Sequence, residues 1–227
     1  MKTSAEIEKN IANITGVIAQ ACAKAKRDVK QVHILAVSKL QPIEKIEAAY
    51  HCGLRHFGEN YVQELAEKRE KLVHLKDIQW HLIGHLQSNK AKLAVESADF
   101  FHALDSEKLT NELEKKIISK GLTSWPVFIQ MNICDEKTKS GIAISELEGF
   151  SRFVRDKSVF DLRGLMCIPE AKDSPEDSRA AFQKMLVFKK RYGFNELSMG
   201  MSDDFTVAIE EGANWVRIGR KIFGDRE

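Results

Sequence analysis

The sequence has 227 residues and a formal net charge of +2 at neutral pH, with histidine counted as neutral. This length is enough to bury a large core, and it suits either one α/β barrel or two small domains. The near-balanced charge gives no general attraction to nucleic acid or to a membrane surface, and no apolar run approaches the length of a membrane span. The four cysteines form no Cys-x-x-Cys pair, which argues against a zinc site or a disulfide framework and indicates a cytoplasmic protein.

Apolar runs and amphipathic segments alternate from the beginning of the chain to its end. Isoleucines recur at helical spacing at positions 7, 11, 14 and 18, so a helix with one apolar stripe is predicted over 4–26. The predicted strands are 32–37, 55–58, 79–84, 100–104, 127–132, 162–167, 197–199 and 215–218. The predicted helices between them are 42–52, 60–75, 87–95, 106–119, 145–156, 175–191 and 203–211.

This order of elements indicates the fold class. Strict alternation of strands and helices, with no hairpin turn between strands, predicts a parallel sheet. Eight units fit a closed (β/α)8 barrel, a TIM barrel with an added N-terminal helix, formed by one domain over 1–227. The alternative is an open doubly wound sheet, but no Gly-x-Gly-x-x-Gly turn follows the first strand.

The first predicted strand ends abruptly on a lysine. Ile34-Leu35-Ala36-Val37 is a buried apolar run, and Ser38-Lys39 follows it. Lys39 therefore lies at the carboxyl end of a strand, where α/β barrels place their functional groups. In a dry site a lysine loses its proton more easily and can form a Schiff base, whereas the alternative is a lysine that simply meets water.

Two later loops have the composition of an anion site. Ser198-Met199-Gly200-Met201-Ser202 follows the seventh strand and leads into a helix, and Gly219-Arg220 follows the eighth strand. Barrels commonly bind phosphate in these two loops, using backbone N–H groups and a hydroxyl. Either loop alone is also typical of an ordinary turn, and the pair together favours phosphate.

Arg217 is a charge inside the apolar eighth strand, so it needs a partner. It either points at a ligand near the phosphate or points outward to a carboxylate on a helix.

The strand histidines His56 and His81 are, from their positions alone, typical of satisfied core or rim residues. No metal-ligand spacing is present. The charged loop Asp135–Gly141 carries lysines that could meet an anionic ligand.

Several longer motifs occur in order along the chain. They are Ala36-Val37-Ser38-Lys39, Phe57-Gly58-Glu59-Asn60-Tyr61-Val62-Gln63-Glu64, Trp80-His81-Leu82-Ile83-Gly84-His85-Leu86-Gln87-Ser88-Asn89-Lys90 and Leu197-Ser198-Met199-Gly200-Met201-Ser202-Asp203-Asp204. Shorter matches are Asp135-Glu136-Lys137 to Ser140-Gly141, Gly164-Leu165-Met166 and Val216-Arg217-Ile218-Gly219. This set closely resembles the pyridoxal-phosphate homeostasis proteins (the YggS/PROSC family), and the resemblance covers nearly the whole chain.

The resemblance implies an alanine-racemase-like barrel that holds pyridoxal 5′-phosphate (PLP) as a Schiff base. Lys39 matches the Schiff-base lysine, and Arg217 matches the arginine that faces the pyridine nitrogen. The positions that match the phosphate cradle are Ser202, Gly219 and Arg220, the last two through their backbone. The positions that match the surroundings of the cofactor are Asn60, His81 and Met166.

One part of the chain departs from the family pattern. The family usually has a small hydroxyl residue after Arg-Ile-Gly and then another small residue, but this chain has Arg220 and Lys221. A hydroxyl donor to the phosphate is therefore lost. Arg220 either replaces it with charge or points outward, which bears on the affinity for PLP.

The resemblance implies a protein that buffers PLP or delivers it to apo-enzymes, without efficient turnover. An arginine against the ring nitrogen keeps that nitrogen unprotonated, which weakens the ring as an electron sink. This suits a carrier or a racemase and disfavours a transaminase.

Two alternatives remain at this point. An amino-acid racemase needs a second base opposite Lys39, and alanine racemase takes it from a tyrosine of an additional domain across a dimer. This chain ends at the barrel, its Tyr50, Tyr61 and Tyr192 lie in predicted helical segments, and the missing domain favours a monomer. The other alternative is a cofactor-free Schiff-base aldolase, which would not absorb visible light.

Overall fold

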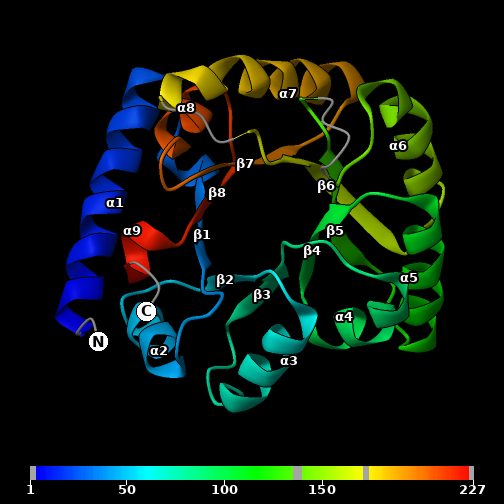
Figure 1. Cartoon of the computed structure of the whole chain (residues 1–227), viewed down its shortest axis with the longest axis horizontal. Helices are drawn as coiled ribbons and strands as arrows, with labels where there is room; N and C mark the ends of the chain where they lie inside the picture. The colour runs from blue at the N-terminus through cyan, green and yellow to red at the C-terminus, as the bar shows by residue number, and fades with distance from the viewer. Residues whose placement is uncertain (1–3, 135–139, 171–173, 225–227) are drawn as a thin grey trace.

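The computed structural model describes residues 4–134, 140–170 and 174–224. Eight parallel strands form a closed barrel in the order of the sequence, and β8 pairs with β1 to complete it (Figure 1). The strands are β1 (His33–Val37), β2 (His56–Glu59), β3 (Gln79–Leu82), β4 (Phe100–Leu104), β5 (Trp125–Met131), β6 (Phe160–Cys167), β7 (Glu196–Met201) and β8 (Trp215–Ile218). The predicted TIM barrel is confirmed, and the open doubly wound sheet is excluded.

The helices lie outside the barrel and cover its strands (Figure 1). They are α1 (Ser4–Lys24), α2 (Ile43–His51), α3 (Val62–Lys71), α4 (Ala91–Ser97), α5 (Glu107–Ser119), α6 (Leu147–Arg155), α7 (Arg179–Tyr192), α8 (Phe205–Glu210) and α9 (Arg220–Phe223), with 3-10 turns η1 (Val29–Gln31), η2 (Ser88–Lys90), η3 (Ile144–Glu146) and η4 (Pro175–Ser178). Because strands of such a barrel are covered on both faces, they read as short apolar runs rather than alternating patterns. Val127, Phe128 and Ile129 of β5 illustrate this, since all three are fully buried.

The added N-terminal helix is also confirmed. The predicted isoleucine stripe of α1 is buried, and it packs α1 against α2, α8 and α9. Asn10 donates a hydrogen bond to the carbonyl of Ile222, 3.0 Å away, and the Lys24 ammonium lies 2.7 Å from a Glu210 carboxylate oxygen. The helix ends slightly earlier than predicted, because Lys26 adopts a left-handed backbone with φ of 53°.

Some predicted boundaries differ where local hydrogen bonds decide them. The fifth strand begins at Trp125 rather than at 127, because the Trp125 N–H donates to the Val159 carbonyl 2.9 Å away and residues 125 and 126 pair in register with β6. The helix predicted over 203–211 is α8, which begins at Phe205 rather than at 203. The carboxylate of Asp204 accepts a hydrogen bond from the N–H of Met201, 2.7 Å away, and holds the turn before the helix.

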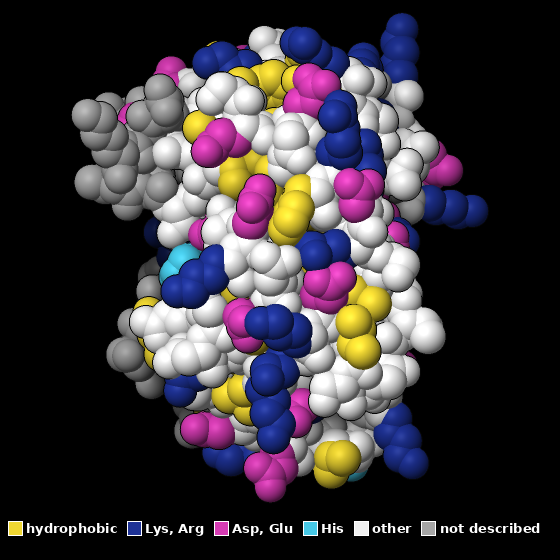
Figure 2. All heavy atoms as spheres, turned by 90° about the vertical axis from the view of Figure 1, so that its right-hand side faces the viewer, with side chains coloured by type: hydrophobic (Ala, Val, Ile, Leu, Met, Phe, Trp, Pro, Cys, Tyr) yellow, Lys and Arg dark blue, Asp and Glu magenta, His cyan; other side chains and the backbone are white. Residues whose placement is uncertain are grey.

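The surface agrees with the near-balanced charge. Figure 2 shows the side formed by α5 and α6, where lysines and arginines lie interspersed with aspartates and glutamates. In the described part of the chain, no helix combines the length and the apolar character needed to cross a membrane.

Candidate ligand-binding site

A cavity of about 840 Å³ opens at the carboxyl ends of the strands. Its lining is Val37, Lys39, Asn60, Ile83, Gly84, His85, Gln130, Met131, Asn132, Ser140, Ile168, Met201, Ser202, Asp203, Arg217, Gly219 and Arg220. Among the residues predicted for the site, the fold brings together Lys39, Asn60, Ser202, Arg217, Gly219 and Arg220. These come from loops or strand ends that are far apart in the sequence, as expected for one rim of a barrel.

Lys39 is half-buried and lies between two residues whose backbone is held firmly. On one side, the N–H of Ser38 donates to the carbonyl of Gly58, 3.0 Å away. On the other side, Leu40 adopts a left-handed backbone with φ of 59°, and its N–H donates to a Glu64 carboxylate oxygen 2.6 Å away. A left-handed conformation is unfavourable for leucine, so the contact to Glu64 stabilises a turn that the backbone would otherwise avoid.

A buried ion-pair cluster supports the same turn. The Lys68 ammonium donates to the carbonyl of Ser38 (2.7 Å) and to carboxylate oxygens of Glu59 (2.9 Å) and Glu64 (2.7 Å). The hydroxyl of Ser38 donates to the same Glu59 oxygen, 2.6 Å away. Glu59 is fully buried, and its other oxygen has no hydrogen-bond partner among the described residues. Burial raises the pKa of Glu59 to about 6, although the Lys68 charge acts in the opposite direction.

Asn60 follows β2 and lines the cavity. Its backbone lies very close to Gly84 in the loop after β3. A Cβ atom at Gly84 would lie 2.2 Å from the Asn60 carbonyl oxygen, so only glycine permits the loop after β3 to pass this closely. The glycine therefore keeps two loops of the rim together.

The loop after β7 presents Ser202 to the cavity. Ser202 is buried at its position between β7 and the turn that leads into α8. Gly200 has φ of 88°, and a Cβ atom there would lie 2.5 Å from the Ala208 side chain, so the loop can turn onto α8 only with glycine. Ser202 lies three positions before the first residue of α8, because the helix begins at Phe205 and not at 203 as predicted from the sequence.

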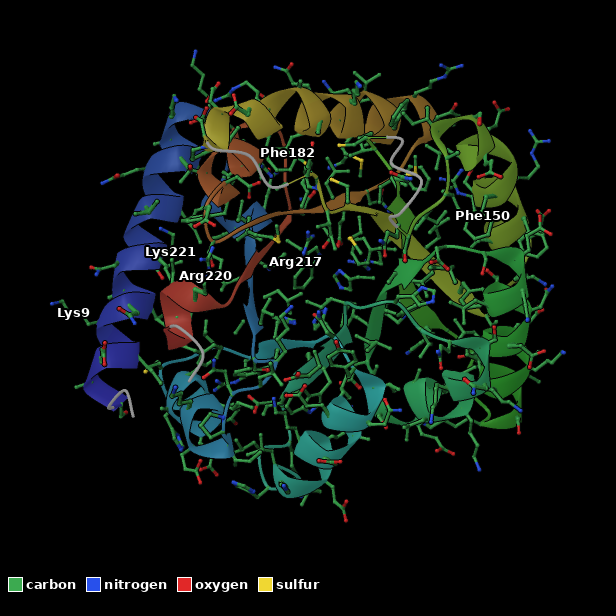
Figure 3. The ribbon with its side chains drawn as sticks, in the orientation of Figure 1. Lys9, Phe150, Phe182, Arg217, Arg220 and Lys221 are labelled. Atoms are coloured by element: carbon green, nitrogen blue, oxygen red, sulfur yellow. The ribbon has the colours of Figure 1, made fainter. Side chains whose placement is uncertain are left out.

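The loop after β8 brings Gly219 and Arg220 to the same side of the cavity. Gly219 precedes α9, and the Arg220 guanidinium forms an ion pair with Asp203 of the neighbouring loop. The Arg220 side chain is exposed, so this pair lies at the cavity mouth. In Figure 3 Arg220 lies on α9 close to α1, whereas Arg217 lies on β8 toward the middle of the barrel.

Arg217 points into the barrel and not outward to a helix. It is buried, and its guanidinium donates to the carbonyl of Cys167 (2.7 Å) and to the hydroxyl of Ser198 (3.0 Å). Both partners are neutral oxygens. Burial lowers the pKa of Arg217 below its ordinary value, because a charged group loses hydration there. A buried guanidinium that lines a cavity is suited to bind an electron-rich ligand atom.

The structure does not bring His81 and Met166 to the cavity lining. Both are fully buried in the barrel interior, on β3 and β6 respectively. Conversely, the cavity includes Gln130, a polar residue in an otherwise apolar strand, whose amide donates to the Ser140 carbonyl 3.0 Å away. That polar interruption was a signal that the sequence interpretation did not use. The charged stretch Asp135 to Lys139 lies outside the described residues.

Comparison with known proteins places this geometry in a family. The family model described as "Alanine racemase, N-terminal domain" matches residues 6–227. A pyridoxal phosphate homeostasis protein of Pseudomonas aeruginosa is 40% identical over 223 residues, which cover 97% of this chain and 96% of that protein. The chain belongs to the pyridoxal phosphate homeostasis protein family. A further family member, from Escherichia coli, is 38% identical over 229 residues and covers 98% of this chain and 97% of that protein.

Solved structures agree with this family assignment. PipY of Synechococcus elongatus, determined with PLP bound, has a TM-score of 0.80 and 35% identity, covering 91% of this chain and all of that one. Alanine racemase from Streptomyces coelicolor has a TM-score of 0.73 at 15% identity, with 97% of this chain and 58% of that chain covered. The second likeness shows the barrel fold alone.

Proposed function

We propose that this homeostasis family member binds PLP, holds it as a Schiff base on Lys39 and takes part in intracellular PLP homeostasis. The observation that carries the proposal is the convergence of Lys39, Arg217 and the loops of Ser202 and Gly219 on one cavity. PLP is bound in a solved structure of PipY, which is 35% identical to this chain.

The residues present fit the chemical groups of PLP. Ser202 offers a hydroxyl, and the Gly219–Arg220 backbone offers N–H groups to a phosphate dianion. On the interior side of the cavity, the Arg217 guanidinium bonds to neutral oxygens and keeps its full charge for a ring nitrogen acceptor. A cationic donor at that nitrogen keeps the nitrogen unprotonated.

Lys39 is placed for the covalent bond. When bound, PLP supplies an aldehyde that an amine can attack and a pyridine ring that withdraws electrons from it. Lys39 would supply the amine that attacks this aldehyde carbon, with the aldehyde oxygen released as water. Hydrogen bonds at Ser38 and Leu40 hold the backbone on both sides of Lys39, so the side chain leaves the backbone at a fixed point of the cavity wall.

The cavity favours holding PLP over racemase turnover. A racemase needs acid–base groups on both faces of the substrate carbon, and Lys39 can serve one face. The described lining residues include no tyrosine. Tyr50 bonds to Asp77 on the outside of the barrel, Tyr61 is exposed at the start of α3, and Tyr192 ends α7.

The remaining parts of the proposal concern the protein in the cell. We place it in the cytoplasm as a monomer, with residues 1–227 acting as one PLP-binding domain. It buffers PLP or delivers it to apo-enzymes, and its site chemistry gives no role for nucleic acid, membrane or a metal.

A visible absorbance spectrum before and after borohydride reduction tests the proposal. We expect visible absorbance that borohydride removes, and peptide mapping should then find the phosphopyridoxyl group on Lys39. Finding the phosphopyridoxyl group mainly on Lys90, Lys137 or Lys139 would overturn the assignment to Lys39. A colourless protein that gains no visible absorbance with added PLP would instead favour the cofactor-free aldolase.

A further inference from the structure

A row of hydrogen-bonded side chains crosses the barrel interior and ends at Arg217. From the amino end of β2, His56 Nδ1 lies 3.0 Å from His81 Nε2, and His81 Nδ1 lies 2.9 Å from His102 Nε2. His102 Nδ1 lies 2.9 Å from the hydroxyl of Ser198, which in turn accepts from Arg217. We call His56, His81, His102 and Ser198 the histidine row.

The interior of the barrel holds the row in place. His81 and His102 are fully buried, while His56 is partly exposed at the far end. The His81 ring stacks on Phe100 with centroids 4.2 Å apart, and the His102 ring stacks on Phe128 at 4.3 Å. Because stacking fixes the ring planes, the ring nitrogens are aimed at one another.

The charge of Arg217 gives the row a direction. A guanidinium only donates, so the Ser198 oxygen accepts from Arg217 and its hydroxyl proton donates onward. Among the described residues, the acceptor for the Ser198 hydroxyl proton is His102 Nδ1. His102 is then protonated at Nε2 and donates to His81 Nδ1, and His81 in turn donates from Nε2 to His56.

The row is also neutral. A neutral imidazole has one donor and one acceptor nitrogen, which is what each interior ring needs here. A protonated ring would carry a second N–H group, at Nδ1, facing the neighbour that already donates to it. Burial lowers the pKa of His81 and His102 well below the ordinary value, and the Arg217 charge lowers that of His102 further.

We propose that His81, His102 and Ser198 are positioning residues that keep Arg217 charged and aimed at the ligand. In this arrangement every lone pair of the row faces toward Arg217 and every proton faces away. Aligned hydrogen bonds polarise one another, so the row stabilises the buried Arg217 cation. Among the described contacts, the guanidinium donates to the Ser198 hydroxyl and the Cys167 carbonyl and to no carboxylate. The effect on the cofactor ring rests on the proposed PLP function.

The first test needs neither PLP nor a variant. Long-range ¹H–¹⁵N spectra of the ligand-free protein, labelled in its histidine rings, report which nitrogen carries the proton. We expect His81 and His102 to be neutral and protonated at Nε2 at neutral pH. A charged ring, or a His102 protonated at Nδ1, would overturn the proposed direction.

The second test cuts the row. Ser198→Ala removes the hydroxyl that sets the direction, so we expect the nitrogen signals of the distant His81 to move toward a mixture of tautomers. Unchanged His81 signals in this variant would contradict the coupling. His33→Phe is the matched control, because the His33 ring lies beside the row, tilted against Trp215 with the two ring centroids 4.6 Å apart, and is outside the hydrogen-bonded sequence.

The third test measures the effect on PLP. Ser198→Ala should weaken PLP binding roughly tenfold and shift the absorbance maximum of the bound cofactor, since Arg217 loses a hydrogen bond of a charged group. His56→Phe should produce a smaller change in the same direction. Wild-type affinity and spectrum in both variants would overturn the positioning role. If the unaltered protein fails to bind PLP, this result counts against the proposed function. The direction of the hydrogen bonds in the histidine row is then decided by the spectra of the ligand-free protein.

Discussion

The ammonium of Lys68 lies 2.7 Å from the carbonyl oxygen of Ser38, so a buried charge holds the backbone directly before the proposed Schiff-base lysine. The same ammonium pairs with Glu59 and Glu64, and Glu64 binds the N–H of Leu40 on the other side of that lysine. One helix, α3, thus fixes the turn at the end of β1.

Removing this charge should loosen the turn and destabilise the fold. Lys68→Met leaves the buried Glu59 carboxylate without its cation, so we expect a loss of about 3–5 kcal/mol in the free energy of unfolding. Schiff-base formation with PLP should also slow. Denaturant unfolding and timed borohydride trapping check the two effects, with the exposed Lys71→Met on the same helix as control. Equal trapping rates in the two variants would contradict the role of Lys68 in placing Lys39.

The buried Glu59 predicts a pH dependence of stability. Its pKa is raised from 4.5 to about 6 in the native protein, so the native state binds more protons than the unfolded state between these values. The free energy of unfolding should therefore fall by about 2 kcal/mol from this group as the pH rises from 4.5 through 6. Glu59→Gln should remove that part of the slope. Denaturant unfolding across this pH range measures the slope. If the free energy of unfolding varies equally with pH in both proteins, Glu59 is not its source.

Ser202 is expected to contribute to phosphate binding. Ser202→Ala should weaken PLP binding by roughly 1–3 kcal/mol, the value of a hydrogen bond to a charged group. Pyridoxal, which lacks the phosphate, should bind far more weakly than PLP and should be insensitive to the substitution. Absorbance titrations with both compounds measure this, with the exposed Ser119→Ala as control. Equal affinity for PLP and pyridoxal would exclude the phosphate cradle.

The ion pair between Arg220 and Asp203 is expected to compete with the phosphate for the arginine. Asp203→Asn should free the guanidinium and strengthen PLP binding by up to about 1 kcal/mol, as for an exposed ion pair. In an Arg220→Ala background the same substitution should have no such effect. A cycle of the four proteins, titrated at low and high salt, measures the coupling. A gain that persists without Arg220 would assign the effect to Asp203 alone.

PLP-loaded protein should exchange the α-proton of amino acids only slowly. Lys39 serves one face of the substrate carbon, and no tyrosine among the described lining residues serves the other. Incubation with L-alanine in deuterated water, followed by mass spectrometry and chiral analysis, measures the exchange, with Lys39→Ala as control. Rapid exchange together with accumulation of the D-isomer would restore the racemase interpretation.

The barrel and most of the cavity could be predicted from local sequence. Lys39, Ser202 and Gly219 each follow a short apolar run, and in a parallel barrel every such position lies at the same rim. Arg217 was identified because a charge within an apolar strand needs a partner, and the structure selects the inward of its two predicted orientations.

The buried residues that hold this rim in place could not be predicted in the same way. Lys68 lies in the charged stretch from Glu64 to Lys76, which has the composition of a solvated helix face. It is nevertheless buried, because its ammonium binds the Ser38 carbonyl after β1 and the Glu59 carboxylate at the end of β2. The resemblance implied a place near the cofactor for His81, whereas its position within a strand predicted a core or rim residue, and the side chain is fully buried in the interior. Its place in the interior depends on ring contacts with β2 and β4, which are far from it in sequence.

The packing of α1 has a consequence for the order of events during synthesis. This helix precedes the other described helices in the chain, but it packs on α8 and α9, the last helices of the described chain, as well as on α2. Until those helices leave the ribosome, the part of the apolar stripe that they cover has no native surface to pack on. The barrel can therefore close only late, and the unfinished chain is the form that most needs protection from aggregation.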